Sequence, residues 1–249
     1  KILKEFCFGQ KAEDFIVNLI FRNNKGTFID VGANDGIKYS NSFAFSKLGW
    51  KGICIEAHPD YYKICCENRD NEFTKILNVA CGKEDSSNVT FYANFRGSLS
   101  TLNPNLDSFY KENYKEFYHD INYNGKIKNF LNGKIEVEGK KLDTIINENI
   151  EFLENKIDLI SIDVDGSEEY LLKGFNILDH KPRVVIFEVS VLRNVIENYM
   201  KDKNYYKIYD NKLNAIYCRD KEDYLLFNKS IKNLKNNIII YKPPHPIDD

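Results

Sequence analysis

Short apolar runs alternate with amphipathic segments through most of the chain. Apolar runs that end in a glycine or a polar residue predict buried strands, and they lie at residues 27–32, 52–56, 75–79, 158–164 and 183–189. Before and between these runs, apolar residues recur at helical spacing, over residues 9–24, 40–48, 60–68, 142–149 and 168–178. Strands separated by helices of roughly ten residues build parallel βαβ units. The pattern therefore predicts an α/β protein with a mostly parallel sheet and helices on both faces.

The last third of the chain carries a different pattern. After a helix predicted over residues 195–201, two strand-like runs at 205–209 and 214–218 are joined by a short Asn-Lys-Leu connection. A connection of this length predicts an antiparallel hairpin. The tail, residues 242–249, contains three prolines, which lack the backbone N–H that regular structure needs, and we expect it to be irregular.

Residues 96–134 interrupt the alternation of strands and helices. They follow an alternating strand predicted at 88–95, and they carry many aromatic residues among polar ones. Four of these have the spacing of one helical face: Tyr110, Tyr114, Phe117 and Tyr118. We interpret the segment as an insertion, either a lid over a substrate or a helix packed on the sheet edge. The whole chain, 1–249, is expected to form one domain that opens with a helical segment over 1–25.

The strongest chemical signal is the turn after the first strand, which holds Asp30, Gly32, Asn34, Asp35 and Gly36. In an open parallel sheet, ligands bind beyond the carboxyl ends of the strands, so a nucleotide-like cofactor is expected here. A dinucleotide fingerprint needs G-x-G-x-x-G, whose second glycine lets the backbone approach a pyrophosphate, but this chain has Asn34 at that place. Two carboxylates would repel a pyrophosphate and suit a cationic cofactor. The turn therefore favours S-adenosylmethionine over NAD.

Glu56 ends the second strand and gives this interpretation a second support. It follows Gly32 by 24 residues, close to the distance at which an acidic residue binds the ribose hydroxyls of an adenosine cofactor. Either feature alone is weak, because acidic residues commonly cap helices and turns. Together they predict a cofactor site.

Carboxylates also follow two later strands. Asp163 and Asp165 come at the end of one apolar run, and Glu188 ends the next. A buried acid costs stability unless it is paired or liganded, so these three are expected to converge on one side of the sheet. They would hold a divalent ion such as Mg²⁺ through oxygen ligands, or Asp163 or Asp165 would act as general base. The alternative is that an acid here only caps the helix that begins near Glu168.

Composition and charge narrow the partners. Lys and Arg number 35 against 37 Asp and Glu, a net charge of −2, which gives no basic footprint for nucleic acid. The longest apolar runs have four residues, far fewer than the ~20 that cross a bilayer, so no membrane span is expected. The six cysteines contain no C-x-x-C pair, and we interpret them as reduced thiols of a cytoplasmic protein.

These motifs, taken in order, resemble those of the FkbM-type methyltransferases. The resemblance extends from about residue 26 to residue 190, and its motifs lie at residues 28–36, 40–42, 48–56, 142–144, 158–168 and 185–188. It implies a class I Rossmann-like fold with a mostly parallel seven-stranded sheet, and S-adenosylmethionine as methyl donor. It also implies an acceptor hydroxyl on a sugar of a surface polysaccharide or natural product. The positions that it assigns to donor binding are Asp30, Gly32, Asn34, Asp35, Asn41, Asp163, Glu56 for the ribose and Ser98 in a nearby loop.

The chain departs from the family pattern at two places and leaves other functions open. Ala57 stands where the family usually has proline, and Asp165 stands where it usually has glutamate, one methylene longer. Acceptor choice is expected in residues 102–134 and beyond 200, where the family gives little guidance. An NAD-linked sugar oxidoreductase or epimerase and a non-catalytic cofactor-binding module remain alternatives. The sequence leaves a homodimer open and does not identify the small-molecule or glycan acceptor.

Overall fold

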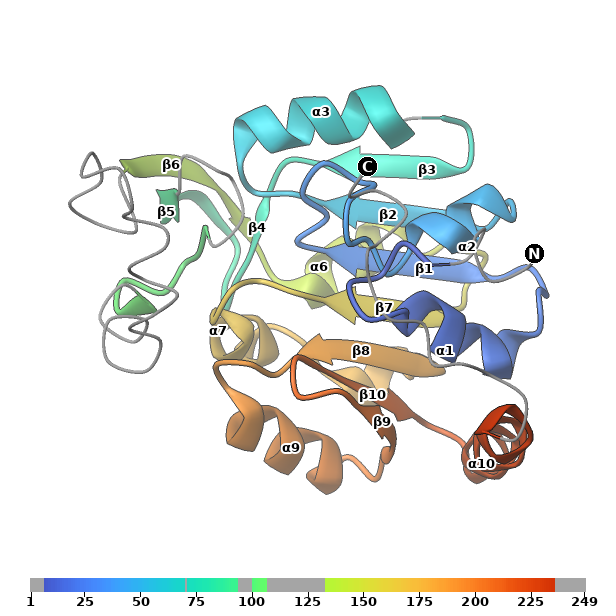
Figure 1. The fold of residues 1–249 in the computed structure, drawn as a ribbon. Coiled ribbons are helices and arrows are strands. Elements are labelled where there is room, and N and C mark those ends of the chain that lie inside the picture. Colours follow the sequence, from blue (N-terminus) through green and yellow to red (C-terminus); the bar gives the residue numbers. More distant parts are fainter. Residues whose placement is uncertain (1–6, 70, 94–99, 107–132, 236–249) are drawn as a thin grey trace, which may run out of the picture.

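The computed structural model describes residues 7–69, 71–93, 100–106 and 133–235 (Figure 1). Its main feature is a seven-stranded sheet of order β3-β2-β1-β7-β8-β10-β9. The strands from β3 to β8 run parallel, and β10 is antiparallel to both of its neighbours. The bounds are β1 Thr27–Val31, β2 Lys51–Ile55, β3 Thr74–Leu77, β7 Leu159–Ile162, β8 Val184–Glu188, β9 Tyr206–Asp210 and β10 Asn214–Cys218. The predicted mostly parallel sheet and the C-terminal hairpin are confirmed.

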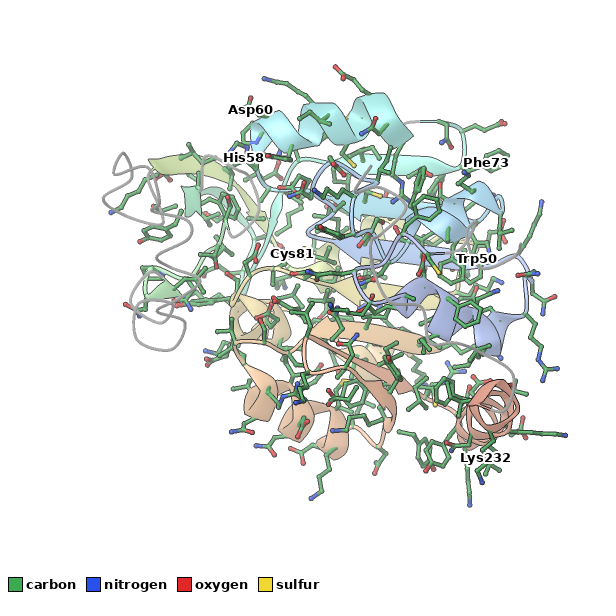
Figure 2. All side chains as sticks on the ribbon, viewed as in Figure 1. Trp50, His58, Asp60, Phe73, Cys81 and Lys232 are labelled. Carbon is green, nitrogen blue, oxygen red and sulfur yellow. The ribbon has the colours of Figure 1, made fainter. Side chains whose placement is uncertain are left out.

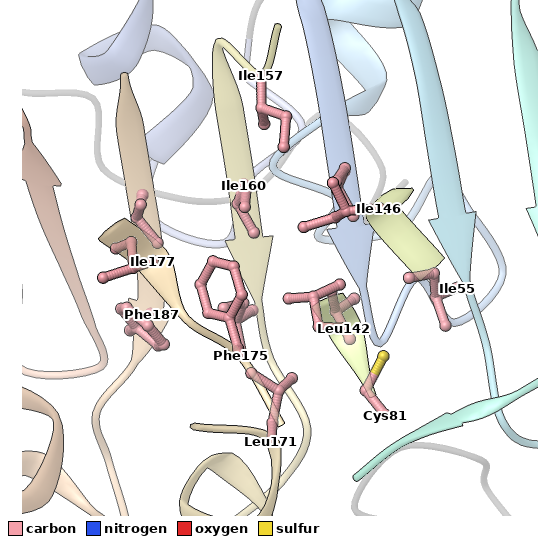
Figure 3. Close-up of a cluster of buried hydrophobic side chains, with 14 of the residues drawn as sticks. Ile55, Cys81, Leu142, Ile146, Ile157, Ile160, Leu171, Phe175, Ile177 and Phe187 are labelled. Atoms are coloured by element: carbon pink, nitrogen blue, oxygen red, sulfur yellow. The ribbon is translucent and has the colours of Figure 1, made fainter. Parts of the chain in front are cut away.

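Helices cover both faces of this sheet, and each face has its own apolar cluster. One face is covered by α1 (Glu13–Phe21), α2 (Phe43–Lys47), α3 (Pro59–Arg69) and α10 (Lys221–Lys235). The other is covered by α6 (Leu142–Asn149), α7 (Glu168–Lys173), α8 (Ile177–His180) and α9 (Arg193–Asp202). Figure 3 shows the second cluster, in which Leu142 and Ile146 of α6 pack on the strands together with Phe175. The two apolar clusters hold the sheet rigid, so the loops at its edge start from fixed positions.

On the α1 face, the strands change from apolar to polar at the edge where β1, β7 and β8 end. Alternate residues of a strand point to one face, and on β8 Val184 and Ile186 of the α1-face cluster are followed by Glu188. The antiparallel β10 begins at the same edge, with Asn214 directly opposite Glu188. The residues that continue this polar row on β1 and β7 are Asp30, Ser161 and Asp163.

A small second sheet stands beside this edge (Figure 1). It has the order β4-β6-β5, with β4 Ala80–Cys81, β5 Ser86–Ala93 and β6 Gly133–Lys140. The strand predicted at 88–95 is thus real but pairs outside the main sheet, and β6 was not predicted at all. Three of the eight β6 residues are exposed, and only Val137 and Gly139 are buried, so its sequence has too few apolar residues to indicate a strand. The expected insertion begins between β5 and β6, and its residues 107–132 lie outside the described part of the chain.

One helix prediction was wrong in extent, and one helix was missed. The helix predicted over 168–178 is broken into α7 and α8 at Gly174, because this backbone packs against another loop. A Cβ at Gly174 would lie 2.1 Å from the carbonyl oxygen of Gly82. The helix α10 was not predicted, and it packs against α1 and the β9–β10 hairpin.

Figure 2 orients the two ends of the sheet. His58 and Asp60 lie at the beginning of α3, near the small sheet, whereas Trp50 lies at the opposite edge, just before β2. Trp50 is fully buried and contacts the rings of Phe21 and Phe45 at centroid distances of 4.9 and 4.7 Å. The apolar edge is therefore closed by core packing, and the polar edge is left for ligands.

Within the described residues, none of the helices combines the length and the hydropathy needed to cross a bilayer.

Candidate functional site

A pocket opens at the polar edge, between the main sheet and the small sheet. Its enclosed part has a volume of about 50 Å³, and about 500 Å³ is empty when the space open to solvent is counted. Its walls come from the ends of β1, β2 and β7 and from the loops beside the small sheet. Of the predicted site residues, the ones that line it are Gly32, Asn34, Glu56, Asp163 and Asp165.

Gly32 lies at the floor of the pocket, where the backbones that follow β1 and β7 are in contact. Its φ of +83° lies in the left-handed region, which glycine adopts without strain. A Cβ at this position would lie 1.7 Å from the carbonyl oxygen of Asp163, so the backbones after β1 and β7 touch here. The N–H groups of Gly32 and Ala33 both donate to the carbonyl of Ile55. Only glycine fits between these strand ends.

Glu56 lies on the β2 side of the pocket and is 7% exposed. Its Oε2 accepts the backbone N–H of Asn34 at 2.7 Å, and its Oε1 accepts that of His58 at 2.7 Å. Burial raises the pKa of Glu56 to about 7, against the lowering effect of these backbone donors. The carboxyl group is therefore fixed in position and faces the pocket from the end of β2.

Asp163 and Glu188 lie on the opposite side, on the same face of the neighbouring strands β7 and β8. Their carboxyl groups are hydrogen-bonded to each other, and one oxygen each of Asp163, Asp165 and Glu188 lies within 4.8 Å of the others. Burial, and then the charge of Glu188, raises the pKa of Asp163 well above its usual value. Burial, and then the charge of Asp165, raises the pKa of Glu188 to about 8. The convergence of these three carboxylates was predicted from the strand pattern.

Glu168 is a fourth carboxylate of this group, and sequence reasoning took it only as the start of a helix. It is 1% exposed, and its Oε1 accepts the N–H groups of Val164 and Gly166 at 3.3 and 3.4 Å. The carboxylate therefore lies under the turn that carries Asp165. Burial, and then the charge of Asp163, raises the pKa of Glu168 to about 7. An acid in the first helical turn resembles an ordinary cap, so no separate signal in the sequence distinguishes it.

Asp30 and Asn41 are buried behind the pocket and do not line it. Asp30 Oδ2 accepts the hydroxyls of Ser40 and Ser42 at 3.1 and 2.5 Å and lies 3.7 Å from Arg69 Nη1. Arg69, which sequence reasoning missed, is 2% exposed. The Nδ2 group of Asn41 donates to the Ser161 hydroxyl at 3.1 Å. These two predicted donor-binding residues therefore brace the loop after β1.

Asp35 and Ser98 complete the predicted set. The Oδ1 atom of Asp35 accepts the N–H groups of Ile37 and Lys38, both at 2.8 Å, so the carboxylate closes its own turn and does not line the pocket. Ser98 lies outside the described residues. Its neighbour Ser100 is 7% exposed and lines the pocket.

A family model described as "Methyltransferase FkbM domain" matches residues 30–206. This span runs from β1 to the first residue of β9 and covers most of the chain. The chain belongs to the FkbM methyltransferase family. The predicted fold class is confirmed, as is the expectation of a methyltransferase that uses S-adenosylmethionine.

Individual relatives of this FkbM methyltransferase are distant. "Methyltransferase sdnD" of Sordaria araneosa is 23% identical over 223 residues, which cover 82% of this chain and 83% of that protein. Among solved structures, TrmK of M. capricolum with S-adenosyl-homocysteine has a TM-score of 0.40 and 11% identity, covering 93% of this chain and 89% of that one. An O-methyltransferase from Bacillus cereus with the same product has a TM-score of 0.36 and 14% identity, covering 88% and 85%. The family membership rests on the family match alone.

The residues that line the pocket of this FkbM methyltransferase indicate what kind of ligand it suits. Its lining contains the carboxylates of Glu56, Asp163 and Asp165, and none of the described lining residues is a lysine, arginine or histidine. Apolar side chains line the part near the small sheet, and they are Val79, Cys81, Phe91 and Leu102. A wall of this kind suits an adenine ring, and the carboxylates suit hydroxyl donors and positive charge. The walls therefore fit an adenosine-containing methyl donor.

Proposed function

We propose that the protein methylates an oxygen atom, most simply a sugar hydroxyl of a small molecule or glycan, with S-adenosylmethionine as donor. The family match gives methyl transfer, and the nature of the acceptor is the proposed part. The observation that supports it is the acidic lining of the pocket, with carboxylates on both sides and no basic residue among the described lining residues. Such a lining suits an acceptor that donates hydrogen bonds and must lose a proton.

On the donor side, Glu56 would accept the ribose hydroxyls, and the apolar wall would contact the adenine. The backbone at Gly32 and Asn34 approaches the pocket closely enough to hold the amino-acid end of the donor. Asp30, Asn41 and Asp35 would support this loop from behind. The bound donor supplies an electrophilic methyl group on a positively charged sulfur.

On the acceptor side, Asp163 or Asp165 would hold the acceptor hydroxyl and take its proton. Both line the pocket on the side opposite Glu56, so a hydroxyl bound there would be near the donor without displacing its ribose. The enzyme would contribute mainly by positioning the two reactants and excluding water. We place acceptor choice in residues 102–134 and beyond 200, within a single domain over 1–249.

The acidic lining argues against the NAD-linked alternative, because a pyrophosphate would face carboxylates without a basic partner. Calorimetric titration with S-adenosyl-homocysteine and with NAD⁺ separates the two. We expect micromolar binding of S-adenosyl-homocysteine and no heat from NAD⁺. Tight NAD⁺ binding would replace the proposed donor.

Turnover is tested by following S-adenosyl-homocysteine production with a panel of methyl glycosides and sugar-bearing natural products. Asp165→Asn should lower the rate on an accepted sugar by about 100-fold or more, the usual range for losing a general base. The matched control is Glu169→Gln, because Glu169 is exposed and forms an ion pair with Lys173 on the surface of α7. Unchanged turnover in Asp165→Asn and Asp163→Asn, with donor binding kept, would favour a non-catalytic role for both carboxylates.

A further inference from the structure

The strand register places Asp163, Asp165 and Glu188 around one small volume. Because Ile162 pairs with Phe187, the next residues along the parallel strands, Asp163 and Glu188, are neighbours on one face. Asp165 follows after the strand end, and one oxygen of each residue lies within 4.8 Å of the others. Asp163 and Asp165 line the pocket, whereas Glu188 lies behind its wall. Three carboxylate oxygens thus meet at the boundary between pocket and core.

Asp163 and Glu188 form no ion pair with a basic side chain in the described part of the chain, whereas the nearby Asp30 has Arg69 at 3.7 Å. The charged groups that act most strongly on Asp163 include Glu188 of β8, Asp30 of β1 and Glu13 of α1, which are acidic. Crowding of like charges in a buried place is costly unless a cation joins them.

Buried oxygens around the three carboxylates also lack hydrogen-bond partners. Glu188 Oε2 has no partner among the described residues, although Glu188 is only 8% exposed. Glu168 is 1% exposed and its Oε2 likewise lacks a partner in the described part of the chain, while its Oε1 is held under the turn between Asp163 and Asp165. Asn214, opposite Glu188 in the register and 3% exposed, has an Oδ1 that no described residue reaches with a hydrogen bond. All three orphan atoms are acceptors, so the missing ligand is a cation or a donor.

We propose that Asp163, Asp165 and Glu188 bind one divalent cation, Mg²⁺ or Mn²⁺. Carboxylate oxygens without imidazole or thiolate are the ligands that these hard ions prefer. The Oε2 of Glu168 and the Oδ1 of Asn214 would complete the surroundings of the ion, directly or through water. The inference deepens the proposed function, because an ion at this wall would face the acceptor side of the pocket and acidify a hydroxyl that reached it.

The test is calorimetric titration of the metal-free protein with MnCl₂, with and without saturating S-adenosyl-homocysteine. We expect one Mn²⁺ per chain, competed by Mg²⁺, and a rise in melting temperature on Mn²⁺ addition. Glu188→Gln should weaken Mn²⁺ binding by about 10-fold or more, and so should Asp165→Asn. Glu169→Gln should bind Mn²⁺ as the wild type does, since Glu169 lies on the exposed side of α7.

Several results would overturn the site. These are the absence of stoichiometric Mn²⁺ binding, equal Mn²⁺ affinity in Glu188→Gln, or displacement of Mn²⁺ by S-adenosylmethionine, which would make the cluster a site for the donor's own charge. Thermal melts of each variant show that it is folded. Failure of the proposed function gives a different result, because loss of S-adenosyl-homocysteine binding or of methyl transfer leaves the Mn²⁺ titration unchanged.

Discussion

Carboxylates on the two sides of the pocket are buried to the same degree but have different partners. On the β2 side, Glu56 is 7% exposed, and its two oxygens accept the backbone N–H groups of Asn34 and His58. On the β7–β8 side, Glu188 is 8% exposed, its Oε1 accepts the Ser190 hydroxyl at 2.5 Å, and its carboxyl group is hydrogen-bonded to that of Asp163, but no N–H or hydroxyl of the described chain reaches its Oε2. One carboxylate is completed by the backbone, and the other is left incomplete.

The difference indicates what each side is built to receive. A carboxylate held by backbone donors keeps its orientation without a ligand, and its remaining lone pairs form a ready acceptor for neutral donors such as ribose hydroxyls. An orphan buried acceptor costs about 1–3 kcal/mol, and several of them near one point favour a ligand that brings positive charge. The comparison therefore assigns donor recognition to the β2 side and the cation to the β7–β8 side.

The largest predicted effect comes from disturbing the backbone contact between the ends of β1 and β7. Gly32→Ala would force a Cβ to within 1.7 Å of the Asp163 carbonyl oxygen, which no side-chain movement can relieve. We expect a loss of more than about 3 kcal/mol in the free energy of unfolding and no S-adenosyl-homocysteine binding, measured by urea denaturation and calorimetry.

Gly49→Ala is the matched control for this substitution. Gly49 has a similar φ of +78°, but a Cβ there would meet only the side chain of Lys25, at 3.7 Å. It should cost only the backbone strain, about 1–2 kcal/mol. If the two variants lost the same stability, the contact between the β1 and β7 ends would not be what fixes the pocket.

The parts of this site that sequence predicted are those at the ends of apolar strands. Gly32, Glu56, Asp163 and Glu188 each end such a run, and parallel strands bring these ends to one edge. The parallel βαβ arrangement and the hairpin followed from the same periodicity.

The missed parts depend on contacts that periodicity does not encode. Arg69 reaches Asp30 across 39 residues of chain, Glu168 turns inward from a helix start, and β6 pairs with β5 through half-exposed residues. Asp35 was predicted to bind the donor. Its carboxylate instead accepts hydrogen bonds from the N–H groups of Ile37 and Lys38, as the carboxylates of acids in turns commonly do.

The next largest effect is the pH dependence of S-adenosyl-homocysteine binding, which we expect from the β2 side of the pocket. Glu56 has its pKa raised to about 7, so its ionised fraction grows as the pH rises from 6 to 8. Ribose hydroxyls bind the ionised form better, and S-adenosyl-homocysteine affinity should therefore rise by up to about 10-fold over this range, since a charged hydrogen bond contributes about 1.5–3 kcal/mol. Stability changes in the opposite direction, because a raised pKa means that the folded protein gains from the proton and loses this contribution as the pH rises through about 7.

Calorimetry at several pH values measures this dependence. Glu56→Gln should bind S-adenosyl-homocysteine weakly, and its affinity should be flat between pH 6 and 8. Asp60→Asn, a nearby exposed acid at the start of α3, should keep the wild-type slope. A slope that persists in Glu56→Gln would move the pH dependence to another group and remove the ribose role from Glu56.

The smallest effect is on the free energy of unfolding, measured at pH 8 in the presence of EDTA. Glu56→Gln and Glu188→Gln should change it in opposite directions. Glu56→Gln places an amide against a backbone N–H that now has no acceptor, and should cost about 1–2 kcal/mol of unfolding free energy. Glu188→Gln keeps an acceptor for Ser190 and a hydrogen-bond partner for Asp163, removes one of several crowded acids, and should add about 1 kcal/mol. Saturating Mn²⁺ should reverse the second result, because the wild type binds the ion more tightly and gains more stability from it. Equal destabilisation by both substitutions, in EDTA and in Mn²⁺ alike, would mean that the β7–β8 carboxylates are as fully satisfied as Glu56, and the distinction between the two sides would fall.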